Sequence, residues 1–179
     1  MKRSRFRPTR GRRAALSLLT LSGTLLLGAC SYGLSGGGGF PAAIRTVCIE
    51  PFENQTDRGD LTNEVFNALN SKVPGALGLR YADCKTADAI IRGKILRYDD
   101  TATNYSSSST PGQTQVNLNQ VTITVGVEIV DTKRNVLLWD SNGVNGQGPY
   151  EPAQGDAVGR KKAVEKLVQA VVDGAQSQW

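Results

Sequence analysis

Residues 116–130 read Val-Asn-Leu-Asn-Gln-Val-Thr-Ile-Thr-Val-Gly-Val-Glu-Ile-Val and alternate clearly between apolar and polar side chains. Successive side chains of a β-strand point to opposite faces of a sheet. The odd-numbered residues from Val121 to Ile129 therefore share an apolar face, and the even-numbered residues from Gln120 to Glu128 share a polar one. This pattern predicts a half-buried antiparallel strand with one face on a core.

The segments that follow this strand predict a hairpin and then a helix. Residues 131–135 form a tight connection, and residues 136–140 begin the return strand. Residues 143–155 are rich in Gly and Pro, which predicts a loop. Apolar side chains then recur at helical spacing, which predicts a helix at about 157–176 with one buried stripe.

The segments that precede it add two strands and a helix. Residues 44–51 predict a first strand, and the apolar stripe of residues 61–73 predicts a helix that lies on a sheet. Residues 88–98 predict a long strand with a basic, mixed face that carries Arg92, Lys94 and Tyr98. Residues 99–114 are rich in Ser and Thr with almost no apolar side chain, so they predict a mobile loop.

The order β-α-β-β-β-α defines the expected fold class. We expect an α+β two-layer sandwich, in which a small, mostly antiparallel four-stranded sheet has two helices on one face. Residues 44–179 would form this single domain. The uncovered sheet face carries Thr, Gln, Arg and Lys, and it either meets water or docks on a partner.

The amino-terminal segment has the features of an export signal. Seven basic residues lie within the first thirteen, and residues 14–29 are uncharged and rich in Leu. This run is shorter than the ~20 residues that span a bilayer. Residues 1–29 therefore predict a signal peptide, exported by the general route or, through Arg12 and Arg13, by the twin-arginine route.

The residues at the predicted cleavage site are typical of bacterial lipoproteins. Leu27-Gly28-Ala29-Cys30 resembles a lipobox, which implies acylation of Cys30 as the first mature residue. Two or three acyl chains hold a protein firmly on a membrane, whereas one binds only marginally. Residues 30–43, with four consecutive glycines, would then be a flexible tether.

Charge and composition exclude several classes of function. The chain has 21 basic and 16 acidic residues, and removal of the leader's seven basic residues leaves 14 and 16, a net charge of −2. The mature chain therefore lacks the basic excess of a nucleic-acid-binding domain. It contains no histidine, which excludes His-based catalysis and His-bearing metal sites. We therefore expect no enzyme activity, no cofactor and no metal.

Two cysteines remain once Cys30 is acylated. Cys48 and Cys84 are 36 residues apart. In an oxidising periplasm they could form a disulfide, worth roughly 4 kcal/mol in the chain-entropy model. They could equally remain two buried, unpaired thiols.

Several stretches together resemble the lipopolysaccharide-assembly lipoproteins, the LptE family. The most specific is residues 30–56, which joins the lipid cysteine and Gly-rich tether to Glu50-Pro51-Phe52-Glu53-Asn54-Gln55-Thr56. Residues 87–93 and the helix that ends near Trp179 extend the likeness. The resemblance implies an outer-membrane lipoprotein on the periplasmic side that plugs a partner β-barrel, assists its assembly and contacts lipopolysaccharide.

The contact residues are our own candidates and are not carried over from the family. They are the basic and Thr side chains of the open face, and two cations at the hairpin tip: Arg92, Lys94, Thr122, Thr124, Lys133 and Arg134. The Pro-Phe-x-Asn-x-Thr motif alone also occurs in cell-wall-synthase activators, TolB-like domains and curli-type secretion subunits. A regulatory lipoprotein that binds a periplasmic protein is therefore the alternative.

Overall fold

The computed structural model describes residue 41, residues 43–107 and residues 114–177. The predicted signal peptide, Cys30 and nearly all of the tether lie outside this part of the chain. None of the helices in the described ranges is long and apolar enough to cross a membrane. The elements are β1 (Thr46–Ile49), β2 (Glu53–Asn54), α2 (Leu61–Ala76), β3 (Arg80–Tyr81), β4 (Ala89–Ser107), β5 (Thr114–Asp131), β6 (Val136–Tyr150), the 3-10 helix η1 (Pro152–Gln154) and α3 (Asp156–Gln176).

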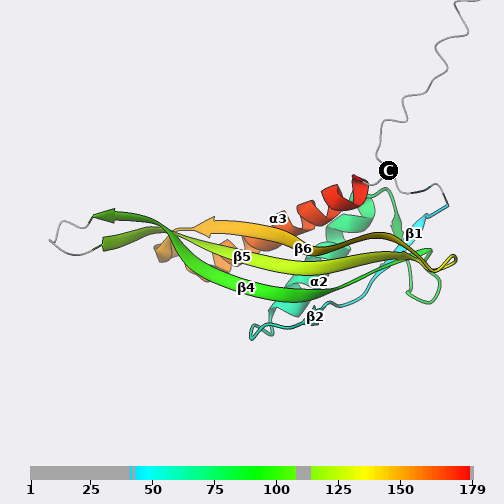
Figure 1. The fold of residues 1–179 in the computed structure, drawn as a ribbon, viewed down its shortest axis with the longest axis horizontal. Coiled ribbons are helices and arrows are strands. Elements are labelled where there is room, and N and C mark those ends of the chain that lie inside the picture. The colour runs from blue at the N-terminus through cyan, green and yellow to red at the C-terminus, as the bar shows by residue number, and fades with distance from the viewer. Residues whose placement is uncertain (1–40, 42, 108–113, 178–179) are drawn as a thin grey trace, which may run out of the picture. The chain divides into compact units, whose positions relative to one another are not determined.

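The domain has two layers, with α2 and α3 on the same face of one sheet (Figure 1). This confirms the predicted α+β class with two helices. The prediction of four mostly antiparallel strands is wrong, because the sheet has six strands in the order β3-β1-β4-β5-β6, with β2 beside β4. β1 pairs in parallel with both β3 and β4, and β2 pairs in parallel with β4.

The physical reasons for this error are local. β2 and β3 have only two residues each, which is too short for a periodic pattern to reveal. The connection from β1 to β4 contains helix α2, and a crossover of this kind lets two strands run in parallel. The sheet is therefore mixed, with the antiparallel part confined to β4, β5 and β6.

The loop predicted at residues 99–114 is wrong for residues 99–107 and 114, while residues 108–113 lie outside the described part of the chain. β4 continues to Ser107, β5 begins at Thr114, and the two strands pair along this whole stretch. β6 reaches only to the partner of Asn119, so the outer part of β4 and β5 is a two-stranded ribbon (Figure 1). A polar ribbon outside the core needs no apolar face, which is why its sequence resembles that of a loop.

Most of the predicted Gly- and Pro-rich loop at residues 143–155 is in fact the second half of β6. Its inward positions carry two glycines, Gly146 and Gly148, because α3 lies directly on the strand backbone. A Cβ atom on Gly146 would come within 2.7 Å of Leu167, and one on Gly148 within 2.6 Å of the Ala163 nitrogen. These glycines permit close helix–sheet contact and do not mark a turn.

The core lies between the sheet and the two helices. The alternation predicted for β5 is confirmed, because all five odd-numbered side chains from Val121 to Ile129 are at most 1% exposed. Helix α2 buries Leu61, Val65, Leu69 and Val73 in the same core. Figure 1 shows that the other sheet face has no helix over it.

Candidate functional site

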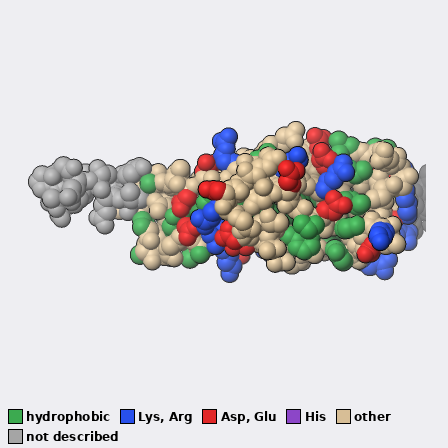
Figure 2. Space-filling model, turned by 90° about the horizontal axis from the view of Figure 1, so that it is seen from below, with side chains coloured by type: hydrophobic (Ala, Val, Ile, Leu, Met, Phe, Trp, Pro, Cys, Tyr) green, Lys and Arg blue, Asp and Glu red, His purple; other side chains and the backbone are tan. Residues whose placement is uncertain are grey.

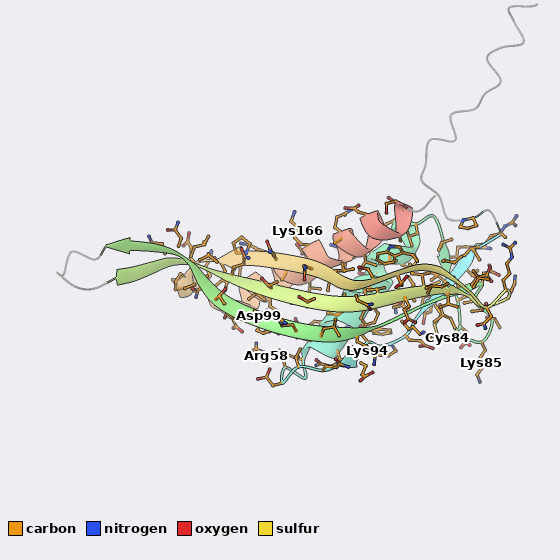
Figure 3. The ribbon with its side chains drawn as sticks, in the orientation of Figure 1. Arg58, Cys84, Lys85, Lys94, Asp99 and Lys166 are labelled. Atoms are coloured by element: carbon orange, nitrogen blue, oxygen red, sulfur yellow. A yellow bond between two sulfur atoms is a disulfide. The ribbon has the colours of Figure 1, made fainter. Side chains whose placement is uncertain are left out.

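The face of the sheet that no described helix covers, hereafter the open face, is the main candidate surface. Strand register brings four of the predicted contact residues onto it. Arg92 pairs with Glu128 across β4 and β5, Lys94 with Gly126, and Thr122 and Thr124 follow on the same side of β5. Figure 3 shows Lys94 and Asp99 along β4, and Lys166 on α3, the helix of the opposite layer.

Two cations of the open face, Arg92 and Lys94, are neutralised by carboxylates. Arg92 Nη2 lies 3.0 Å from Glu128 Oε2, and Lys94 Nζ lies 3.2 Å from Glu53 Oε2. The hydrogen bond from Lys94 lowers the pKa of the Glu53 carboxyl. The exposed Arg97 and Asp99 lie on the same face, opposite Thr124 and Thr122, and their charges are opposite in sign. The open face is therefore polar and close to neutral.

A shallow groove of about 330 Å³ runs along this face over Gly126. Its walls combine the two ion pairs with the exposed Leu96 and with Asn142. Gly126 leaves the floor open, since a Cβ atom there would come no closer than 3.5 Å to its nearest neighbours, Asn142, Leu96 and the Ser141 carbonyl. The groove can accept a polar or small apolar side chain of a partner.

The sequence prediction missed the contribution of β6 to the open face. Thr124 Oγ1 donates to Asn145 Oδ1 at 2.6 Å, and Asn145 is exposed. Asn145 lies in the segment predicted as loop, so nothing in its local sequence placed it beside Thr124. Polar side chains of β4, β5 and β6 therefore form one continuous surface.

Tyr98 does not lie on the open face, contrary to the prediction. A β-bulge between Ile95 and Arg97 shifts the register, so Tyr98 pairs with the buried Ile123 and packs against the core. Arg58 lies 4.8 Å from the centre of its ring. Burial raises the pKa of the Tyr98 hydroxyl.

An ion-pair network near Tyr98 joins the two helices and also escaped prediction. Arg160 of α3, with a side chain 14% exposed, contacts Glu64 at 3.0 Å, Asp156 at 3.3 Å and Asp60 at 3.4 Å. Arg58 binds Asp156 at 2.7 Å, and this hydrogen bond lowers the pKa of the Asp156 carboxyl. The partners are up to 98 residues apart, so sequence spacing could not reveal them.

Lys133 and Arg134 lie apart from the open face, at the tip of the β5–β6 hairpin. Their backbone N–H groups both donate to Asp131 Oδ1, at 2.8 and 3.0 Å, which closes the turn. Asn135 completes it with a positive φ of 53°. Both cationic side chains are about two-thirds exposed. The six contact candidates therefore fall into two separate surfaces.

Asp88 ties this hairpin tip to the start of β1. Its carboxylate accepts hydrogen bonds from Lys133 Nζ at 2.5 Å, from the Arg45 and Thr46 N–H groups at 3.0 Å each, and from Thr46 Oγ1 at 2.9 Å. The bond from Lys133, followed by that from the Arg45 N–H, holds the Asp88 pKa far below its usual range. The ionised carboxylate is thus part of the fold.

Asp88→Asn should remove a stabilisation that depends on pH. A carboxyl whose pKa is lowered by folding stabilises the native state above its unfolded pKa of about 4 and loses this effect as the pH falls further. The wild type should therefore have the higher Tm at pH 7, and the gap should narrow progressively as the pH falls below about 4. Thermal melts across this range measure it, with the exposed Asp57→Asn as control. A gap that stays constant would contradict the role given to Asp88.

The structure joins Cys48 and Cys84 by a disulfide, with the Cα atoms 4.9 Å apart. Cys48 is buried in β1, and Cys84 follows β3 in the segment that leads to Asp88. The bond fastens this segment to the edge of the sheet. Among the described residues, no three His, Cys, Asp or Glu side chains meet as a metal site.

The fold and its surfaces define a small α+β domain whose notable feature is an open, polar sheet face. The chain belongs to the LptE family, because the family model described as lipopolysaccharide-assembly matches residues 44–173. This confirms the family resemblance drawn from the sequence. The family is one of non-enzymatic lipoproteins associated with lipopolysaccharide transport. No curated protein sequence matches the chain.

Solved structures share the fold at low sequence identity. An uncharacterised lipoprotein B from Nitrosomonas europaea has 13% identity and a TM-score of 0.54, with 82% of this chain and 92% of that one covered. A hypothetical protein from Chlamydia trachomatis has 11% identity and a TM-score of 0.52, with 76% and 98% covered. A protein from Xanthomonas campestris has 10% identity and a TM-score of 0.51, with 78% and 91% covered. These similarities establish the fold alone.

Proposed function

We propose that this chain is a lipid-anchored outer-membrane component of the lipopolysaccharide transport machinery, which plugs a partner β-barrel and assists its assembly. Residues 1–29 are its signal peptide, Cys30 carries the acyl chains, and residues 30–43 tether the domain on the periplasmic side. The domain acts by contact and catalyses no reaction.

The observation that carries this proposal, beside the family match, is the chemistry of the open face. The lumen of an outer-membrane barrel is polar. A plug needs a face that can replace water there with hydrogen bonds and ion pairs. The Thr, Asn and Gln side chains of β5 and β6 and the two neutralised cations, Arg92 and Lys94, meet this requirement.

Contact with lipopolysaccharide is a second element of the proposal. Arg92 and Lys94 would have to exchange their carboxylate partners for lipid A phosphates, while Thr122 and Thr124 supply neutral hydrogen bonds. Lys133 and Arg134 are more exposed, but Asp88 and Asp131 partly neutralise them. We therefore assign the open face to the barrel first and to lipopolysaccharide second.

Extraction of the acylated protein in mild detergent tests the proposal. We expect a β-barrel of several hundred residues to co-purify with it, because the polar face is complementary to a lumen. Purification of Cys30→Ala in parallel reports whether the anchor is needed for assembly. Recovery of the protein alone would contradict the proposal, and recovery with a soluble periplasmic protein would favour the regulatory alternative.

A further inference from the structure

The sheet topology gathers a group of exposed side chains at one end of the domain. Thr46 pairs with Arg80, Val47 with Ala89, and Ala89 with Asp131, so β1, β3 and β4 begin where β5 ends. The β5–β6 turn lies at the same end. We name this region the tether-end surface, because the chain enters the domain here, and define it as Arg45, Arg80, Tyr81, Lys133, Arg134, Val136 and Leu137.

This surface is unusually apolar for an exposed hairpin tip. Val136 is 51% exposed and Leu137 is 50% exposed. Tyr81, which follows Arg80 in β3, is 55% exposed. Of the large hydrophobic side chains that are exposed in the described residues, only Leu96 lies elsewhere, in the groove of the open face. Apolar side chains gathered at one exposed end indicate a contact.

The same surface is cationic. Its four basic side chains are exposed, and Lys85 lies at the same end (Figure 3). Figure 2 shows basic side chains gathered at the right-hand end of the domain. Two nearby carboxylates, Asp88 and Asp131, are only 8% and 3% exposed and are held by backbone N–H groups, whereas Asp83, which accepts from the Lys85 N–H, is exposed. The exposed charge is therefore predominantly positive.

Exposed apolar side chains between cations are the composition of a surface that rests on anionic lipid headgroups. The position of the lipid anchor along the chain points to the same partner, the membrane. Cys30 precedes Arg45 by fifteen residues, which span roughly 50 Å at full extension. The tether-end surface is therefore the part of the domain nearest, along the chain, to the acylated residue.

We propose that the tether-end surface docks on anionic phospholipids of the leaflet that holds the acyl chains of Cys30. Val136 and Leu137 enter the interface, and Arg45, Arg80, Lys133 and Arg134 face the phosphates. This inference rests on the lipid anchor of the proposed function and extends it, because docking fixes the direction in which the open face is presented.

The test uses the full acylated chain on phosphatidylcholine vesicles, with or without phosphatidylglycerol. A fluorophore on Leu137→Cys reports contact through a quencher attached to the lipid. The matched control carries it on Thr101→Cys, which is exposed and lies roughly 35 Å away along the sheet. With phosphatidylglycerol present, we expect quenching at residue 137 to be several-fold stronger than at residue 101.

Reversing the charge of two arginines distinguishes docking of the tether-end surface from a domain that is merely held close to the membrane by its anchor. Arg45→Glu with Arg80→Glu should reduce quenching at residue 137 to the level at residue 101, as should high salt. Neither arginine has a carboxylate partner among the described residues, and a thermal melt checks the fold of the variant.

Three results would overturn the proposal. They are equal quenching at the two positions, quenching that is independent of phosphatidylglycerol, and quenching that requires added lipopolysaccharide. In each of these the protein still floats with the vesicles, so the anchor stands. Failure of the acylated protein to float would instead refute the anchor and the docking together.

Discussion

Gly148→Ala should lower the free energy of unfolding by about 3 kcal/mol, the upper end of the usual cost of overpacking a core. A Cβ atom at this position would overlap the carbonyl oxygen of Gly159 and lie 2.6 Å from the Ala163 nitrogen. These are backbone atoms of α3, so the helix must move away from β6, and contacts of its buried stripe are lost.

Urea denaturation measures this loss, and the same strand supplies a control. Gly143 has no atom within 4 Å of the position of a Cβ atom, so Gly143→Ala should change stability by less than about 0.5 kcal/mol. Gly146→Ala should resemble Gly148→Ala, because Leu167 and the Ala163 carbonyl occupy the equivalent space. If Gly148→Ala proved as stable as Gly143→Ala, the close packing of α3 on β6 would be disproved.

Thr124→Glu should reduce recovery of the barrel complex at least about tenfold, which corresponds to about 1.4 kcal/mol of binding free energy. Thr124 lies in the middle of the open face, and a carboxylate there would be buried in the interface. Arg97, its register partner on β4, can pair with the new charge in the free protein, so the fold should tolerate the change.

The measurement is the yield of complex after detergent extraction, normalised to the amount of lipoprotein. Asn67→Glu introduces the same charge on the exposed side of α2, away from the open face, and should leave the yield unchanged. Equal yields for the two variants would show that the partner binds elsewhere. A thermal melt of each variant excludes a general loss of folding.

The sequence predicted those parts of the fold that depend on burial. The alternation of β5 and the stripe of α2 follow from apolar side chains that must leave water, so both are visible in the order of residues. The outer part of β4 is held by strand pairing alone and has no such pattern. The glycines of β6 suggested a turn because the helix that requires them is distant in sequence.

The sequence likewise predicted one part of the candidate site and missed another. Thr122 and Thr124 follow from the period of one strand. The neutralisation of Lys94 by Glu53 depends on a two-residue strand, and the burial of Tyr98 depends on a β-bulge. Both arise from how the strands are aligned in space, which no single segment of sequence specifies.

Crosslinking from the open face tests the central claim most directly. A photoreactive amino acid in place of Thr122, in the acylated protein within intact cells, captures whatever lies within a few ångströms of β5. We predict a covalent adduct with an outer-membrane β-barrel, identified by mass spectrometry, and no such adduct from the same group at Asn67. An adduct with a soluble periplasmic protein, or none from residue 122 while residue 67 captures the barrel, would contradict the claim.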